Sequence, residues 1–377
     1  MLNCEVVIIG GGIAGLWTLN HLRNQGYQAI LLEKTALGAG QTIASQGIIH
    51  GGIKYALSGE LSNSSVQISD MPALWRACLQ GKGDIDLSDV TVLSDHYYLC
   101  SQQKITQRIT QFFAQKALSS DSDALAKKDY PAFFQSKNFN GLLTQVHECV
   151  LDVPSLIQVL AKKMMPYIFK INDCSLEKNN DHYLVKVDNT LLNAKHIILT
   201  AGEGNAALLP EAAMQKRALQ MVVLKADNLP KIFVHCVGLS TNPILTITSH
   251  VDSNGKTVWY LGGQIAEDGI HRDKQTQIAK AQTLIQQQFP WFTPINPQWD
   301  TLNINRAEGF NNGKRPESTM ISTVSNIMIA WPTKLTFAPL LAQQLAQRLP
   351  QALHETMPEI NLGAKPEIAL SVWDKTC

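Results

Sequence analysis

An α/β fold is predicted for this chain, with one domain built on a parallel sheet and another built on a mainly antiparallel sheet. Three observations lead to this prediction. Glu5–Ile9 is rich in β-branched residues, as in strands buried on both faces of a parallel sheet. A glycine-rich turn and a helical pattern follow it directly, which is the order of a βαβ unit. Much later, Ile244–Ser249 and Thr257–Gly262 are strand-like runs on either side of Asn254-Gly255, a strong hairpin signal.

Length and charge narrow the classes of function. A chain of 377 residues allows two or three domains at about 150 residues each, and a large core without disulfide or metal support. The 32 basic and 31 acidic side chains leave a net charge of +1, which argues against a nucleic-acid partner, RNA substrates included. Charged residues make up 17% of the chain, against about 25% in typical proteins, so much of it is expected to be buried.

The sequence also predicts a compartment. Its first residues, MLNCEVVIIGGG, contain no basic segment and only a short apolar run, so we expect neither a secretory nor a transit signal. No window approaches the roughly 20 apolar residues that cross a bilayer. The 7 cysteines are scattered without a CxxC pair, which argues against zinc, iron–sulfur and thiol-exchange sites. We therefore expect a cytoplasmic protein with no resident metal and no transmembrane segment.

The N-terminal segment matches a dinucleotide-binding motif in its full context. Gly10–Gly15 fits the pattern GxGxxG and directly follows the first predicted strand. Leu16–Gln25 has apolar residues at helical spacing, and Ala29–Leu32 is a second buried strand that ends in Glu33. Strand, turn, helix, strand and acid in this order are what the motif requires. The alternative is a glycine-rich turn in an ordinary βαβ unit.

Each residue of the motif has a physical role in binding a dinucleotide. Gly10 permits the tight turn, Gly12 lets the backbone approach a pyrophosphate, and Gly15 lets the helix pack close to the strand. The N–H groups at the helix start, including that of Ala14, are expected to face the phosphates. Glu33 is expected to accept hydrogen bonds from a ribose, and its charge disfavours a 2′-phosphate, so NADP is disfavoured.

The residues after this unit distinguish between the possible cofactors. Instead of another βα repeat, Gly38–Tyr55 is rich in glycine and small residues and holds one His, one Lys and one Tyr, namely His50, Lys54 and Tyr55. Small residues let a backbone run close beneath a flat ring system. This composition favours a flavin over a nicotinamide.

The stretch SQGIIHGGIKY, from Ser45 to Tyr55, resembles the flavin-contacting loop of the D-amino-acid oxidase-like FAD-dependent oxidoreductases. It is most similar to the glycerol-3-phosphate dehydrogenase and L-2-hydroxyglutarate dehydrogenase branches, and less similar to glycine and sarcosine oxidases. The resemblance extends over most of the chain. It implies FAD as cofactor and a Rossmann-like FAD-binding domain interleaved with an α+β substrate domain on a mainly antiparallel sheet.

The resemblance also implies which residues contact FAD and substrate. His50 lies in the flavin loop, where it is expected next to the flavin or in catalysis; the alternative is a structural histidine. Further cofactor contacts are implied along the chain, at Lys34, Ser45, Gln46, Gly47, Cys174, Ala201, Gly202, Thr333, Lys334, Leu335 and Thr336. Cys174 is placed near the adenine only by its order along the chain.

Two basic residues are candidates for charged contacts. Arg306 occupies the place where the family commonly has an Arg-Pro pair that grips a substrate carboxylate, although Ala307 replaces the proline. Arg315-Pro316 offers a competing register, and either arginine could instead pair with an acid. At the closing motif, from Trp331 onward, the usual glycines are absent, and Lys334 could supply positive charge near the flavin or lie on the surface.

The remaining elements fill in the two domains. Nothing from about 70 to 140 indicates catalysis, and we expect a strand at Asp95–Cys100, a helix at Ile105–Leu118 and a loop at Ser119–Lys128. Asp152 is expected to cap a helix that runs to about Met165. The other expected elements are strands at Ile168–Leu176, Tyr183–Val187, His196–Thr200, Leu219–Lys225 and Asn326–Ala330, and helices at Asp273–Gln288 and through about Leu349.

The order of the motifs predicts an interleaved chain. The FAD-binding domain is expected from residues 1–75, 145–215 and 305–377. The substrate-binding domain is expected from residues 76–144 and 216–304.

These observations predict an FAD-dependent oxidoreductase, a dehydrogenase or oxidase of a small molecule. We expect oxidation of the CH–OH group of a 2-hydroxy acid or glycerol phosphate by hydride transfer to flavin N5, with His50 as base and Arg306 on the acidic end. The alternatives are an amino-acid or N-methyl amine oxidase of the same fold and a flavin-binding module without turnover. The sequence leaves open whether oxygen, a quinone or an electron-transfer protein accepts the electrons.

Overall fold

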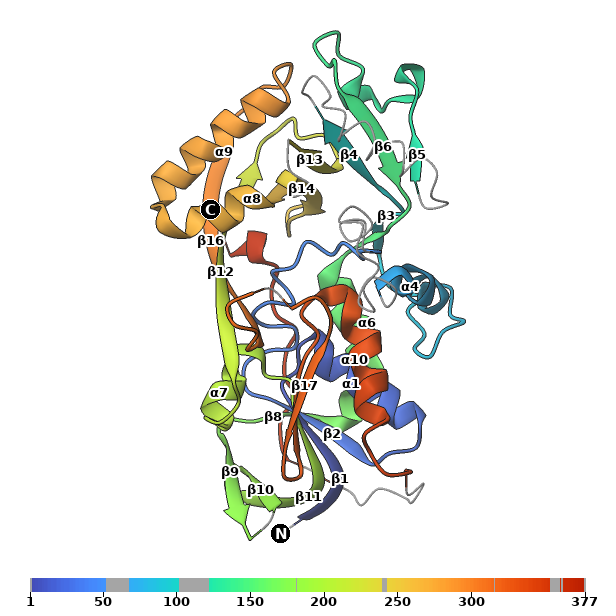
Figure 1. The fold of residues 1–377 in the computed structure, drawn as a ribbon, viewed down its shortest axis with the longest axis vertical. Helices are drawn as coiled ribbons and strands as arrows, with labels where there is room; N and C mark the ends of the chain where they lie inside the picture. Colours follow the sequence, from blue (N-terminus) through green and yellow to red (C-terminus); the bar gives the residue numbers. More distant parts are fainter. Residues whose placement is uncertain are drawn as a thin grey trace.

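The computed structural model describes residues 2–51, 68–101, 122–180, 182–238, 243–314, 316–352, 360 and 362–375. Two large sheets organise the chain, one in each half of an elongated molecule (Figure 1). The helix predicted at Ile105–Leu118, together with Lys54, Tyr55 and Arg315, lies outside the described residues.

The first sheet has a parallel centre. Its strand order is β17-β18-β11-β1-β2-β8, and β10 and β9 extend it from β11. The pairs from β18 to β8 are parallel, whereas β17 runs antiparallel to β18. The strands are β1 (Leu2–Ile9), β2 (Ala29–Glu33), β8 (Ile168–Lys170), β9 (Cys174–Asn179), β10 (His182–Val187), β11 (Thr190–Leu199), β17 (Met320–Val324) and β18 (Ile327–Trp331).

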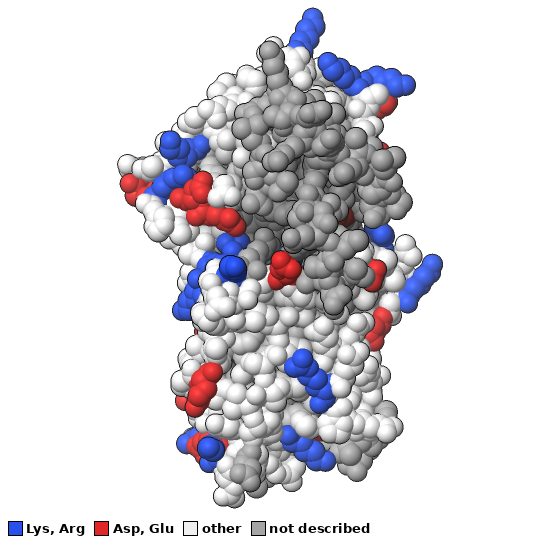
Figure 2. Space-filling model, viewed as in Figure 1, with Lys and Arg blue, Asp and Glu red and all other residues white. Residues whose placement is uncertain are grey.

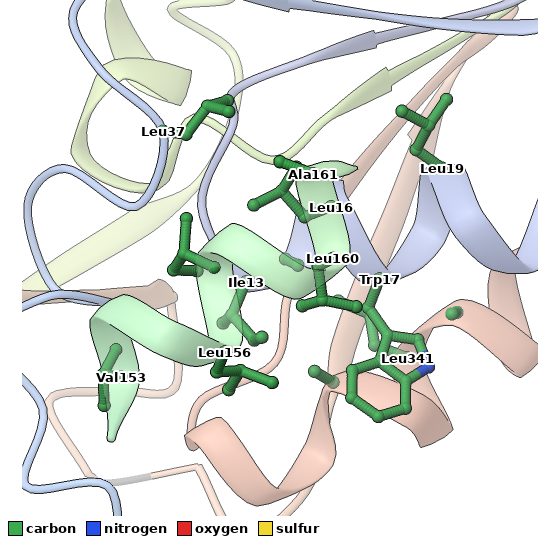
Figure 3. Packing of buried hydrophobic residues seen from close by; sticks show 14 of the residues in the cluster. Ile13, Leu16, Trp17, Leu19, Leu37, Val153, Leu156, Leu160, Ala161 and Leu341 are labelled. Atoms are coloured by element: carbon green, nitrogen blue, oxygen red, sulfur yellow. The ribbon is translucent and has the colours of Figure 1, made fainter. Parts of the chain in front are cut away.

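Both faces of the first sheet are buried because its strands are apolar on both sides. In β1, Val6 and Ile8 face one hydrophobic cluster, whereas Val7 and Ile9 face another. The first cluster packs under four helices, seen in part in Figure 3. These helices are α1 (Ile13–Asn24), α4 (Met71–Leu79), α6 (Val153–Lys162) and α10 (Ala338–Ala346).

The second sheet is antiparallel except for one parallel pair, β13 with β4. Its order is β16-β12-β15-β14-β13-β4-β6-β5. The strands are β4 (Tyr97–Ser101), β5 (Ser122–Ala124), β6 (Leu142–Val146), β12 (Met214–Lys225), β13 (Phe233–Val237), β14 (Pro243–Val251), β15 (Thr257–Gly262) and β16 (Gln298–Gly309). Helix α9 (Lys274–Gln288) shares the hydrophobic cluster of this sheet. The mixed α/β class and the mainly antiparallel second sheet are as predicted.

Short elements connect the two sheets. Strands β3 (Val92–Ser94) and β7 (Val150–Leu151) pair with each other, and the short helices α7 (Asn205–Leu208) and α8 (Gln264–Asp268) follow β11 and β15. The long pair β12 and β16 runs along one side of the molecule and reaches both halves (Figure 1).

Several local predictions are confirmed. The Asp152 carboxylate accepts a hydrogen bond from the Ser155 N–H at 2.9 Å and caps α6, and Asp273 caps α9 in the same way. Strands β14 and β15 form the predicted hairpin, and Gly255 in its turn has φ +78°. Each of these predictions depends on residues that are close together in sequence, so contacts with distant segments do not alter the predicted cap or turn.

Two local predictions are wrong. The single strand expected over Ile168–Leu176 is two strands, β8 and β9, because β8 pairs with β2 and β9 pairs only with β10. The loop expected over Ser119–Lys128 contains β5, a three-residue edge strand held by its pairing with β6. In both places the pairing partner decides the structure, and the partner is distant in sequence.

Lys, Arg, Asp and Glu side chains are scattered over the face shown in Figure 2 and do not gather into a patch of one sign. Among the described residues, no helix is long and apolar enough to cross a membrane.

The start of α1 lies against the ends of two strands. A Cβ atom at Gly15 would overlap the carbonyl oxygen of Gly10 and lie 2.8 Å from the Thr200 hydroxyl oxygen. That hydroxyl itself donates to the Gly10 carbonyl at 2.9 Å. Gly10 has φ +114°, a conformation that other residues rarely adopt. This close approach confirms the packing role predicted for Gly15.

Replacing Gly15 by alanine tests this contact. Alanine raises helix propensity, but the overlap with a backbone carbonyl outweighs that gain, so we expect Gly15→Ala to lower the free energy of unfolding by about 1–3 kcal/mol. The measurement is denaturant unfolding. Gly204→Ala is the control, since Gly204 has φ −71° and the added Cβ would meet the Ala201 Cβ at 3.3 Å. Equal stabilities of the two variants would contradict the packing role.

A buried histidine links stability to pH. His250 is 1% exposed and stacks on Trp373 with ring centroids 4.1 Å apart, and its Nε2 lies 2.9 Å from the Thr248 hydroxyl. Burial lowers the pKa of His250 from 6.5 to about 3. The unfolded chain therefore binds a proton below pH 6.5 that the folded chain does not bind until about pH 3.

Folding stability should consequently fall as the pH is lowered through this window. The contribution of His250 has a slope of up to about 1.4 kcal/mol per pH unit. In His250→Gln this contribution is absent, so the stability advantage of the wild type over the variant should shrink from pH 7 to pH 4. Urea unfolding of both proteins at a series of pH values measures this difference in stability. Parallel curves of unfolding free energy against pH for the two proteins would show that His250 does not titrate in this way.

Candidate active site

A cavity of about 1390 Å³ lies between the two sheets. Small-molecule pockets usually measure about 300–1,000 Å³, so this one has room for a large cofactor together with a substrate. The β1–α1 turn, the segment 39–46, the end of β11, the facing strands β12 and β16, and the segment 330–335 all contribute to its wall. Segments far apart in sequence thus meet at one site, as predicted.

The glycine-rich turn forms one end of the cavity. Gly10, Gly12 and Ala14 line it, and at Gly11 an added Cβ would lie 2.6 Å from Leu37 and 3.0 Å from the Glu33 carboxylate. Leu37 and Glu33 therefore pack directly against the backbone of this turn, which leaves no room for a side chain at Gly11. The start of α1 points its positive dipole end at the cavity, as an anion-binding site requires.

Glu33 is fixed beside this turn. Its Oε2 accepts a hydrogen bond from the Gly11 N–H at 2.6 Å, and its Oε1 accepts from the N–H and the hydroxyl of Thr35 at 2.6 and 2.8 Å. The side chain is almost fully buried and lines the cavity. A carboxylate oxygen has more than one lone pair, so Glu33 keeps acceptor capacity for a ligand hydroxyl.

Lys34 and Cys174 lie at the same end of the cavity. The Lys34 ammonium is exposed and lies 3.7 Å from the Asp173 carboxylate. Burial raises the pKa of the Cys174 thiol to about 12, so it is a neutral wall residue at physiological pH. Both residues line the cavity, and their contact with the cofactor stays a prediction.

Ser45 and Gln46 line the middle of the cavity. The Gln46 amide donates to the Tyr260 carbonyl at 3.0 Å, and the Tyr260 hydroxyl donates to the Ala44 carbonyl at 3.0 Å. This segment is thereby attached to the second sheet. The Ser45 hydroxyl is buried and has no hydrogen-bond partner within the described part of the chain. A buried hydroxyl without a partner in a cavity wall fits a ligand that supplies one.

The end of β11 forms the wall beside the glycine-rich turn. Ala201 and Gly202 line the cavity, and Gly202 has φ +57°. The Ala201 N–H donates to the side chain of Asn205 at 2.9 Å, which holds this turn. The backbone of this turn is thus exposed to the cavity, and its predicted approach to the cofactor stays a prediction.

In the segment after β18, a residue other than glycine adopts the left-handed backbone conformation that glycine usually occupies. Thr333 has φ +61°, which is rare for a β-branched residue, and its hydroxyl donates to the Ser318 carbonyl at 3.0 Å. This explains how the closing motif dispenses with the usual glycines. Thr333, Lys334 and Leu335 line the cavity, and the Lys334 ammonium lies 5.2 Å from the ring centroid of Phe337.

Three predicted contact residues do not line the cavity. Gly15 packs α1 onto β1. Gly47 has φ +73°, and a Cβ there would overlap the Leu151 carbonyl oxygen. The Thr336 hydroxyl is fully buried and accepts a hydrogen bond from the His50 N–H at 2.8 Å. Their positions fit residues that shape the wall, and direct contact with the cofactor stays a prediction for them.

His50 belongs to a cluster of polar aromatic residues. Its ring lies 5.7 Å from that of His235 and 6.3 Å from that of Tyr97, and all three line the cavity. The Nδ1 of His50 lies 3.8 Å from the Glu148 carboxylate, which is 3% exposed and accepts a hydrogen bond from the Tyr97 hydroxyl at 3.0 Å. His235 in turn lies 2.7 Å from the Thr246 hydroxyl. Burial next to Glu148 raises the pKa of Tyr97 well above its usual value of 10.

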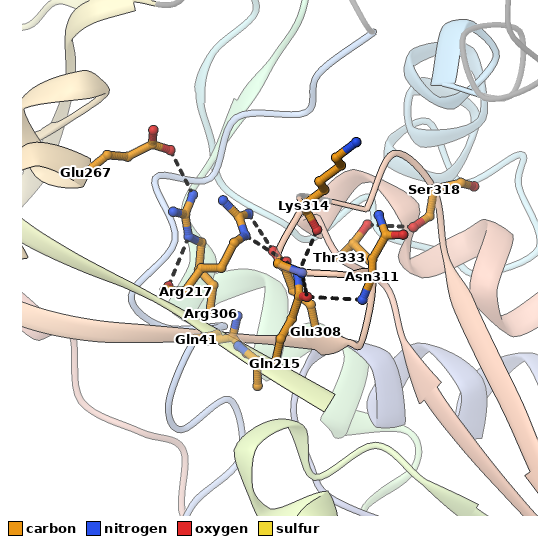
Figure 4. Close-up of polar contacts among 12 residues, drawn as sticks. Gln41, Gln215, Arg217, Glu267, Arg306, Glu308, Asn311, Lys314, Ser318 and Thr333 are labelled. Atoms are coloured by element: carbon orange, nitrogen blue, oxygen red, sulfur yellow. Dashed lines mark hydrogen bonds and ion pairs between the residues drawn. The ribbon is translucent and has the colours of Figure 1, made fainter. Parts of the chain in front are cut away.

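Two arginines lie opposite each other on β12 and β16 (Figure 4). Arg306 donates to the Glu267 carboxylate at 3.2 Å and to the Arg217 carbonyl at 3.4 Å. Arg217 donates twice to Glu308, at 2.8 and 2.6 Å. Both arginines line the cavity, and the pairing with an acid that the sequence left open for Arg306 is present.

Comparison with known proteins identifies the family. The DAO model, described as FAD dependent oxidoreductase, matches residues 5–348. The chain belongs to this family. It is 39% identical over 386 aligned positions to the probable FAD-dependent oxidoreductase PA4991 of Pseudomonas aeruginosa, covering 99% of this chain and 98% of that protein. The crystal structure of PA4991 superimposes with a TM-score of 0.85, at 35% identity over 99% of this chain and 98% of that one.

More distant solved structures share the fold. L-α-glycerophosphate oxidase of Mycoplasma pneumoniae with FAD bound has a TM-score of 0.67 at 14% identity, over 92% of this chain and 94% of that one. Glycine oxidase of Geobacillus kaustophilus has a TM-score of 0.67 at 12% identity, with the same coverage. This protein is an FAD-dependent oxidoreductase, and its glycine cradle, its unpartnered Ser45 hydroxyl and the size of its cavity fit FAD.

Sequence reasoning missed several residues of the cavity wall. Tyr97 lies in the region where nothing indicated catalysis, and His235, Arg217 and Glu267 were not singled out. Glu148, which lies beside His50 and does not line the cavity, was missed as well. The one sequence signal for Arg217 is alternation, since the apolar residues Leu219 and Met221 follow it at every second position and face the same cavity. The others join the site through strand pairing that no local pattern specifies.

Glu33 offers a test of the cofactor site. Glu33→Gln replaces an acceptor of three hydrogen bonds by an amide, so we expect FAD binding at least tenfold weaker, in line with the roughly 1.5–3 kcal/mol of hydrogen bonds to charged groups. Fluorescence titration of the FAD-free protein with FAD measures the change. Glu203→Gln is the control, because Glu203 lines the same cavity but is half-exposed and pairs with Lys216. Equal affinities of the two variants for FAD would show that Glu33 does not contribute to FAD binding.

Proposed function

We propose that this FAD-dependent oxidoreductase oxidises the CH–OH group of a small anionic hydroxy compound, either a 2-hydroxy acid or glycerol phosphate. The observation that carries the proposal is the pairing of His50, which lines the cavity, with the buried Glu148 beside it. When bound, FAD supplies the acceptor for the two electrons that leave the substrate.

His50 acts as the general base in this proposal. Its Nδ1 faces the Glu148 carboxylate, and its Nε2 accepts the proton of a substrate hydroxyl. A carboxylate that is 3% exposed stabilises the positive charge that the imidazole gains with this proton. The Tyr97 hydroxyl holds Glu148 in place, and the Thr336 hydroxyl holds the His50 backbone.

Arg306 binds the anionic end of the substrate, and Lys334 adds positive charge to the opposite part of the wall. Both side chains line the cavity, and neither belongs to the cofactor cradle at the β1–α1 turn. A planar guanidinium suits a carboxylate or a phosphate because it offers paired N–H donors.

The two sheets correspond to the two functions in this proposal. The strands of the first sheet come from residues 2–33, 168–199 and 320–331, which supports an FAD-binding domain in the three expected pieces, 1–75, 145–215 and 305–377. The second sheet supports a substrate domain from 76–144 and 216–304. Strands β12 and β16 cross the proposed boundaries at 215 and 304, so they belong to both domains.

Oxidation of an amine is the competing function. A neutral amine has no hydroxyl proton to lose, so it does not require a base such as His50. Solved structures with this fold include enzymes named for both kinds of substrate, at 12–15% identity, so the fold itself favours neither. The paired His50 and Glu148 favour the hydroxy compound.

Anaerobic mixing of the yellow holoenzyme with a panel of hydroxy acids, glycerol phosphate and amino acids tests this function. We expect a hydroxy compound to bleach the flavin absorbance, and His50→Asn to slow that bleaching by a factor of about 10²–10⁴, the usual contribution of a general base. The variant should still bind FAD. Bleaching by amino acids alone, with His50→Asn as fast as the wild type, would overturn the proposal.

A further inference from the structure

The two arginines of the cavity wall are held in different ways. Arg217 makes two short hydrogen bonds to Glu308, whose side chain is only 1% exposed. A bidentate pair with a buried carboxylate cannot open without leaving that charge buried and unpaired. Arg217 is therefore fixed, and Glu308 permanently balances its charge.

The contact between Arg306 and its acid, Glu267, is looser. Glu267 contacts Arg306 through a single Nη1–Oε1 hydrogen bond of 3.2 Å, and the Glu267 side chain is 40% exposed. Glu267 lies on the five-residue helix α8, which is bounded by Gly263 and Gly269. An exposed carboxylate on a short helix can exchange Arg306 for water at small cost.

Apolar side chains adjoin the arginine pair on the same face of the strands. Leu219 lies opposite Ile304, and Met221 lies opposite Leu302, in the register that places Arg217 opposite Arg306. Side chains two residues apart share one face of a strand. All four apolar residues line the cavity, so the wall changes from apolar to cationic along its length.

Glu267 thus presents to Arg306 the same chemical group that an acidic substrate would present. We propose that Glu267 occupies the position of the substrate's anionic group and leaves Arg306 when that group binds. Glu267 is then a specificity-determining residue: it competes with weakly bound anions and sets the affinity for the substrate through Arg306. This inference rests on the proposed function only for the anionic substrate, and not for the oxidation of CH–OH.

The test uses anions that cannot react. Oxalate and inorganic phosphate have no C–H bond to oxidise, and they represent the two possible anionic groups, carboxylate and phosphate. Their binding to the holoenzyme is measured by isothermal titration calorimetry. We expect Glu267→Gln to bind at least one of them about tenfold more tightly than the wild type, and Arg306→Gln to bind the same anion at least tenfold more weakly. The anion that responds identifies the group.

A double variant separates competition at Arg306 from general charge repulsion. If Glu267 acts through Arg306, then Glu267→Gln has no further effect in the Arg306→Gln background. An equal tenfold gain in both backgrounds would overturn the inference, because it would show that Glu267 merely repels anions. Unchanged affinities in the Glu267→Gln single variant for both anions would overturn it as well.

Two further variants complete the design. Asp268→Asn removes the neighbouring exposed charge on α8 and is the matched control, with unchanged affinity expected. Glu267→Asp keeps the charge and should restore part of the competition. With an identified substrate, Glu267→Gln should lower KM by a larger factor than it changes kcat, since Glu267 competes for Arg306 and does not touch the reacting atoms.

The outcomes distinguish this inference from the proposed function. If no hydroxy compound bleaches the flavin but the anions obey the double-variant pattern, the reaction is wrong and the role of Glu267 stands. If a hydroxy compound bleaches the flavin and anion binding does not depend on Glu267, the proposed reaction stands and the role of Glu267 is wrong.

Discussion

The contact between the start of α1 and the ends of β1 and β11 determines where everything else in the site can lie. Gly15 meets the Gly10 carbonyl without a side chain between them, and the Thr200 hydroxyl donates to the same carbonyl at 2.9 Å. The helix start, the glycine turn and the carboxyl end of β11 therefore form one rigid corner. The cavity extends from this corner, so helix dipole, Glu33 and Gly202 all face the same volume.

A second set of bonds ties that corner to the other sheet. The Gln41 side chain accepts a hydrogen bond from the Ala307 N–H of β16 at 3.0 Å, and Gln46 donates to the Tyr260 carbonyl of β15. The segment between them, 41–46, is thus part of the cofactor wall and is also attached to the sheet that carries Arg306. The wall at the glycine-rich turn and the wall formed by the second sheet are therefore linked by a few short-range hydrogen bonds.

The parts of the fold that the sequence predicted are those whose signals are local. The β1–α1–β2 unit with Glu33, the caps at Asp152 and Asp273, and the Asn254-Gly255 hairpin each depend on residues close together in sequence. The cluster around His50 is different, because Tyr97, Glu148 and His235 come near it only through the strand order β13-β4-β6. Pairing between distant strands leaves no periodic pattern in any one of them, so half of the polar wall could not be found in advance.

The conformation of Thr333 has a consequence for the evolution and engineering of this enzyme. A β-branched residue at φ +61° costs on the order of 1–3 kcal/mol, and Asn adopts this conformation more easily. The position therefore specifies a backbone shape and not a residue type. A substitution of Thr333 could therefore raise the stability of the protein without changing the shape of the cavity. A sequence search that requires glycine at this position would miss enzymes that, like this one, have another residue there.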